Sequence, residues 1–70
     1  MAMVRYDNER LWLERRRRGL TQEEVATRAR CTRLTVHRVE RGRNASPGMV
    51  RRICLAVGAS PDVVIYSSIR

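Results

Sequence analysis

The alternation of hydrophobic and polar residues along this chain follows helical spacing, and glycines interrupt it at three points. Gly19, Gly42 and Gly58 each follow a stretch with helical spacing. A glycine at positive φ commonly ends a helix, because it lacks a Cβ atom that would clash there. The glycines therefore divide the chain into short helical segments.

Helix starts follow these glycines. Thr21 and Glu24 have the spacing of a capping box, in which the side chain of each residue accepts a hydrogen bond from the backbone amide of the other. The Ser-Pro pairs at 46–47 and 60–61 place an N-cap hydroxyl before a first-turn proline. Thr32 is a further N-cap candidate.

These signals predict an all-α domain, a compact five-helix bundle that spans residues 1–70. The expected helices cover about residues 7–18, 22–29, 33–41, 47–57 and 61–66. The apolar run at 63–66 has strand propensity, but the Ser-Pro-Asp before it favours a helix start, and no segment shows sustained strand alternation.

The helical spacing also predicts the core. Short helices are marginal on their own, so their inward faces must pack together. The residues expected to do so are Leu11, Leu20, Val25, Ala26, Ala29, Val36, Val39, Met49, Ile53, Cys54, Val57, Val63 and Val64.

Positive charge is concentrated in the middle of the chain. The net charge is +8, and all fifteen basic residues are arginines. A GC-rich source accounts for most of the preference for arginine over lysine, but not for its position. Residues 28–52 hold eight arginines against the single acid Glu40, whereas residues 53–70 are neutral overall. Such a patch favours a polyanionic partner.

Other classes of function find little support in the composition. A chain of 70 residues buries only a thin core, and no pair or cluster of residues resembles a catalytic site, so we expect no enzyme and no small-molecule ligand. Cys31, Cys54 and the single His37 lack metal-ligand spacing, so we expect reduced thiols, no metal and no cofactor. No apolar run approaches the ~20 residues of a membrane span, and the N-terminus has no signal core.

The chain resembles the lambda-repressor and Cro-type (XRE-type) helix-turn-helix family, ungapped from Leu11 to about Val64. The residues that carry the resemblance are Gly19-Leu20-Thr21-Gln22, Val25-Ala26, Val36, Glu40-Arg41-Gly42, Pro47, Gly58 and Asp62. The resemblance implies a motif over about residues 21–42, formed by the second and third helices. It also implies a cytoplasmic, nucleoid-associated protein encoded by a bacterium or phage.

In this family the second motif helix lies in the DNA major groove. If Val36 and Val39 face inward, the base-contact candidates face outward: Thr32, Arg33, Leu34, His37 and Arg38. Arginine can bond guanine in a bidentate way, and leucine can meet a thymine methyl.

The resemblance also implies contacts that carry no base information. Gln22 is expected to bond a phosphate at the start of the second helix, and Arg41, Arg43 and Asn44 to contact the backbone after the third. Arg15 and Glu40 correspond to an ion pair that joins the first helix to the third.

Two residues depart from the family pattern. Arg30 occupies the turn position that usually holds glycine, so either it adopts a positive φ or the turn differs. Glu14 occupies a position that is often apolar, and Trp12 and Leu13 lie beside it.

The leading hypothesis is sequence-specific binding of double-stranded DNA by a transcriptional regulator, with repression favoured. A homodimer, at least on DNA, and a palindromic operator are expected; the candidate dimer contacts are Val63, Val64, Ile65, Tyr66 and Ile69, followed by Trp12 and Leu13. The alternative is a protein-interaction role on the same fold, like that of an antitoxin or a bridging factor, with secondary DNA binding.

Overall fold

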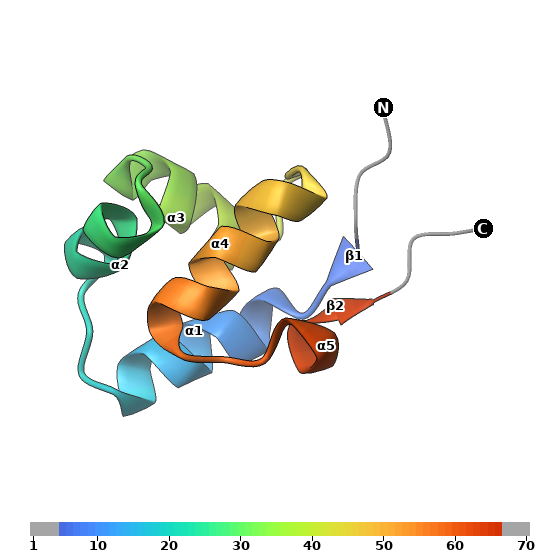
Figure 1. Ribbon diagram of the computed structural model, residues 1–70, viewed down its shortest axis with the longest axis horizontal. Helices are drawn as coiled ribbons and strands as arrows, with labels where there is room; N and C mark the ends of the chain where they lie inside the picture. The colour runs from blue at the N-terminus through green and yellow to red at the C-terminus, as the bar shows by residue number, and fades with distance from the viewer. Residues whose placement is uncertain (1–4, 67–70) are drawn as a thin grey trace.

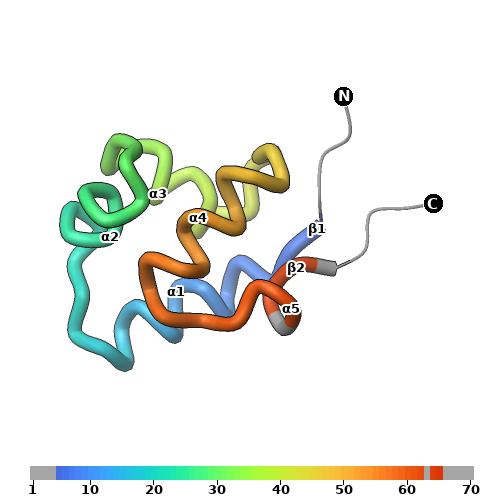
Figure 2. Tube along the Cα trace, viewed as in Figure 1, coloured from blue at the N-terminus to red at the C-terminus, as the bar shows by residue number. Residues whose placement is uncertain are grey.

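The computed structural model describes residues 5–66 (Figure 1). Its helices pack around one core, and a small sheet lies at one end. The elements in chain order are β1 (Arg5–Tyr6), α1 (Asn8–Arg17), α2 (Gln22–Ala29), α3 (Arg33–Glu40), α4 (Pro47–Val57), α5 (Pro61–Val64) and β2 (Ile65–Tyr66). The sheet and α2 lie at opposite ends of the long axis (Figure 2).

Side-chain caps start the helices at three of the predicted positions. Thr21 and Glu24 form the capping box, with both reciprocal hydrogen bonds present. Thr32 caps α3, and Ser46 caps α4 through a 3.2 Å bond from the Met49 amide. At α5 the prediction is only partly right, because Ser60 occupies the N-cap position before Pro61 as expected but makes no side-chain hydrogen bond there.

The five-helix prediction is only partly right. Four helices have eight or more residues, but α5 is a single turn of four residues. The chain then leaves the helix as β2 and pairs antiparallel with β1, with Tyr6 opposite Ile65. The Asp7 amide donates to the Val64 carbonyl at 2.8 Å and continues this pairing. The apolar run at 63–66 therefore ends as a strand despite the Ser-Pro-Asp helix signal before it, because β1, about sixty residues earlier in the chain, pairs with it.

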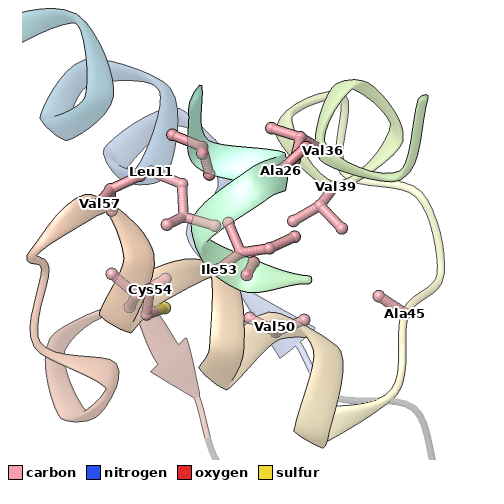
Figure 3. Packing of buried hydrophobic residues seen from close by; sticks show 12 residues of the cluster. Leu11, Ala26, Val36, Val39, Ala45, Val50, Ile53, Cys54 and Val57 are labelled. Atoms are coloured by element: carbon pink, nitrogen blue, oxygen red, sulfur yellow. The ribbon is translucent and has the colours of Figure 1, made fainter. Parts of the chain in front are cut away.

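The core forms where the inward faces of the helices meet around Ile53 (Figure 3). Its members are Leu11, Val25, Ala26, Ala29, Val36, Val39, Ala45, Val50, Ile53, Cys54, Val57 and Val64. Most of these follow the predicted pattern, but Val50 and Ala45 were missed, and Met49 and Leu20 are only partly buried. The inward face of α4 therefore includes Val50 more fully than Met49.

The four longer helices end in the same backbone arrangement, a left-handed residue followed by a reversal of the chain. Gly19, Gly42 and Gly58 hold this position with φ of 68°, 79° and 83°, as the sequence predicts. At the end of α2 the left-handed residue is Arg30, with φ 59° and ψ 49°. Of the two alternatives for this turn, the structure has the one in which arginine accepts positive φ.

Candidate nucleic-acid interface

The outer face of α3 is a row of exposed side chains on a helix whose inner face is buried. Val36 and Val39 are almost fully buried, which turns the opposite side of the helix outward. The five base-contact candidates, which we call the reading face, are all exposed: Thr32, Arg33, Leu34, His37 and Arg38. Leu34 is 52% exposed. The reading face therefore combines cationic, polar and apolar groups that can meet base edges.

Thr32 is held in place by its capping role. Its Oγ1 accepts a 3.1 Å bond from the Thr35 amide and lies 2.9 Å from the Thr35 hydroxyl. The side chain is therefore oriented before any ligand arrives.

The loop after α3 carries the predicted backbone-contact residues Arg41, Arg43 and Asn44, and all three are exposed. Arg41 and Arg43 line a hollow together with Leu34, His37 and Arg38. The loop is thus continuous with the reading face, and it adds two cations to the two that the face already carries.

Two residues that sequence reasoning missed support this loop from the N-terminal part of the chain. The Tyr6 hydroxyl donates to the Arg43 carbonyl at 2.6 Å, and the Asn8 Nδ2 donates to the Glu40 carbonyl at 2.9 Å. A Cβ atom on Gly42 would approach the Asn8 side chain to 3.2 Å. No local motif marks Tyr6 or Asn8, because their partners lie more than thirty residues away.

Gln22 is partly buried at the start of α2 and faces α3. Its Nε2 donates to Glu40 Oε1 at 3.0 Å, and its Oε1 accepts a long bond of 3.5 Å from Arg33. A groove beside it is lined by the α1–α2 turn and by Arg33. Gln22 therefore lies between the buried carboxylate of Glu40 and the first arginine of the reading face.

Arg15 and Glu40 form a bidentate ion pair that joins α1 to α3. Arg15 Nε lies 2.5 Å from Glu40 Oε2, and Nη2 lies 3.0 Å from Oε1. Both side chains are buried, and Arg15 Nη1 also donates to the Leu20 carbonyl at 2.9 Å. Removing one partner of such a pair costs ~3–5 kcal/mol, because it leaves the other charge buried without compensation.

Glu14 is buried, and the charge of its carboxylate is compensated by neighbouring arginines. Its carboxylate accepts hydrogen bonds from Arg18 and Arg10, and Arg17 lies 3.7 Å away. The hydrogen bond from Arg18, followed by that from Arg10, lowers the pKa of Glu14 to about 2. The run of arginines in α1 thus has a structural role through Glu14.

The residues expected to mediate dimerisation differ in whether they are exposed for such a contact. Val64 is fully buried in the core, so it is not available for such a contact, and the prediction for this residue is wrong. Ile65 is paired with Tyr6 in the sheet, while Ile69 and the side chains of Val63 and Tyr66 lie outside the described part.

On α1, Trp12 and Leu13 are 43% and 44% exposed. The Arg16 guanidinium lies over the Trp12 ring, 5.0 Å from its centre, at a distance typical of a cation–π contact.

Both cysteines are free, Cys31 partly buried and Cys54 buried. Burial raises the pKa of the Cys54 thiol to about 11 and raises that of Cys31, which the charge of Arg52 partly opposes. Within residues 5–66, no group of three His, Cys, Asp or Glu side chains is placed to hold a metal ion. None of the described helices has the length and apolar character needed to cross a bilayer.

A comparison with protein families gives a match to the helix-turn-helix domain family over residues 9–64. The chain belongs to this family. No curated protein and no solved structure matches it. The matched range extends from α1 to α5, so the family assignment covers the helical part of the chain. Helix-turn-helix domains bind DNA by placing the second helix of the motif in the major groove.

Proposed function

We propose that this helix-turn-helix domain is a sequence-specific, XRE-type regulator of transcription that inserts α3 into the major groove of double-stranded DNA. The observation that carries the proposal is the reading face: an exposed Leu34 between Arg33 and Arg38, on a helix anchored from behind by buried valines. One apolar and two cationic side chains on one exposed helix face are the groups that contact base edges, which supports the proposal.

The reading face and the loop have different roles in this proposal. Arg33 and Arg38 read guanines, Leu34 meets a thymine methyl, and His37 and Thr32 contact base edges near them. Arg41, Arg43 and Asn44 contact phosphates and fix the register of the helix on the duplex.

Gln22 adds a phosphate contact at the start of α2. Its amide nitrogen donates one hydrogen bond to Glu40, and a side-chain amide has a second N–H that a phosphate oxygen could accept. The positive end of the α2 dipole favours an anion at this position.

Regulation would follow from occupancy of a site near a promoter, with repression by exclusion of polymerase. A palindromic operator would be bound by a homodimer, since paired helix-turn-helix domains read two half-sites one helical turn apart. Exposure of Trp12 and Leu13 supports α1 as the contact between the two copies. The protein would then act in the cytoplasm, on the nucleoid of a bacterium.

Selection of bound sites from random DNA tests the proposal directly. We expect a defined sequence with inverted-repeat symmetry. On that sequence Arg33→Ala should lose ~1–3 kcal/mol of binding free energy and relax selectivity at one base position. The matched variant Arg43→Ala should weaken binding to all sequences alike and reduce the salt slope by about one.

The outcome that contradicts the proposal is also defined. If both variants lose the same affinity on selected and on random DNA, α3 does not read bases. Weak, indiscriminate DNA binding together with a tight protein partner would instead favour the protein-interaction role.

A further inference from the structure

The turn between α2 and α3 is the one left-handed helix end in the described part of the chain that has a residue other than glycine. The Cys31 amide donates to the Ala26 carbonyl at 2.9 Å, and the Arg30 amide to the Thr27 carbonyl at 3.3 Å. At the end of α4 the Gly58 amide donates to the Leu55 carbonyl and the Ala59 amide to the Cys54 carbonyl in the same pattern. Arg30 therefore adopts a backbone geometry made for glycine, at a steric cost that its Cβ imposes.

Arg52, on α4, donates to this turn from the side. Its Nη2 lies 2.6 Å from the Ala29 carbonyl and 2.8 Å from the Arg30 carbonyl. Ala29 is the last residue of α2 and is buried. A guanidinium at this point also meets the negative end of the α2 dipole. The two short bonds favour the left-handed conformation, because it aligns both carbonyls towards one nitrogen.

We propose that Arg52 is a positioning residue that holds the left-handed turn at Arg30 and thereby sets the orientation of α3 on DNA. The proposal rests on the function proposed above. Only Cys31 and Thr32 separate the turn from Arg33, so a change in the turn is transmitted to the start of the reading face. Eight residues of helix measure about 12 Å, so a rotation of about 10° at the turn displaces the far end by about 2 Å.

Two features argue that Arg52 serves the turn rather than the DNA backbone. Both of its hydrogen bonds are to backbone carbonyls of the turn, and a single nitrogen makes them. Arg28 lines the same groove but extends towards α4 instead, where it donates to the Ala56 carbonyl at 3.5 Å. Three arginines line the groove, Arg28, Arg30 and Arg52, and of these only Arg52 donates from its side chain to the carbonyls of the turn.

Amide hydrogen exchange tests the first half of the proposal without DNA. Arg52→Ala should speed exchange of the Cys31 amide by about tenfold, the effect expected for a lost charged hydrogen bond. Arg52→Lys should recover part of the protection, since an ammonium can reach both carbonyls. Arg51→Ala is the control, because it removes an equal charge from an exposed position on the same helix. An unchanged rate in Arg52→Ala overturns the proposal.

The second half is tested on the selected DNA sequence and on its single-base variant opposite Arg33. Arg52→Ala should reduce discrimination between the two by about threefold to tenfold. The same substitution in an Arg30→Gly background should have little effect, because glycine needs no support in this conformation. This double variant also keeps the test valid if Arg52→Ala alone folds poorly.

The alternatives give different results. If Arg52 contacts a phosphate, Arg52→Ala should weaken binding to both sequences and lower the salt slope by about one in either background, and the proposal is overturned. If the wild-type protein binds no specific sequence, the proposed function and the role of the turn in reading both fail. The exchange rates of Cys31 would still show whether Arg52 holds the turn.

Discussion

The ends of α2 and α4 share one backbone geometry but reach it by different means. Each helix ends at a left-handed residue, Arg30 or Gly58, and at each end an arginine from elsewhere in the chain donates to a carbonyl. Arg52 makes contacts of 2.6 and 2.8 Å to the α2 end, whereas Arg18 makes one contact of 3.2 Å to the Gly58 carbonyl. The strained end has the shorter contacts, and the unstrained end the longer one.

The difference shows where each helix end obtains its stability. At Gly58 the local sequence suffices, because glycine adopts positive φ readily. At Arg30 the conformation costs roughly 1–2 kcal/mol, which is comparable to what hydrogen bonds from a charged group contribute. The end that adjoins the reading helix therefore depends on a tertiary contact.

Exchanging the residue at the α4 end gives the largest expected effect. Gly58→Arg should lower the free energy of unfolding by ~2 kcal/mol, since the position has a φ of 83° and a new Cβ would lie 3.1 Å from Arg18 Nε. Urea denaturation measures the loss. Gly48→Ala is the control, because Gly48 lies within α4 with open space around it and should tolerate a Cβ. Equal stability of Gly58→Arg and wild type would mean that the two ends do not differ in strain.

Lowering the pH should weaken the α4 end more than the α2 end, by less than the loss expected for Gly58→Arg. Arg18 is held by Glu14, whose pKa in the folded protein is lowered to about 2. A carboxyl with a depressed folded pKa stabilises the protein above its unfolded pKa and loses that contribution as the pH falls towards about 2. Between pH 4.5 and 2, exchange protection of the Ala59 amide should decrease more than that of Cys31, because Arg52 contacts carbonyls that do not titrate. Equal loss at both amides would contradict the comparison.

Placing glycine at the α2 end gives the smallest expected change in stability. Arg30→Gly removes the strain but makes the unfolded chain more flexible, so we expect a change within about 1 kcal/mol and a small net gain. Thermal unfolding of Arg30→Gly gives the sign of the change in stability. Thr27→Gly, which places a glycine at an exposed helical position, is measured beside it as the control. A clear loss in Arg30→Gly would show that its side chain stabilises the turn by itself.

Much of the candidate site was readable from local sequence. The helix starts at Thr21, Thr32 and Ser46 follow from side chains that bond amides three residues away, and the structure confirms them. The exposure of α3 follows from the spacing of two valines. Tyr6, Asn8 and Arg52 were not found, because each acts on a carbonyl that is remote in sequence.

The sequence by itself determined the four longer helices, the buried faces that join them and the cationic face of α3, because caps, glycines and periodicity act over one or two turns. Tertiary structure decided what depends on distant partners. It turned the end of the expected fifth helix into β2 beside β1, and it stabilised a left-handed arginine through Arg52. Neither outcome has a local signal, since a strand needs an edge to pair with and a strained turn needs a donor that the fold alone brings to it.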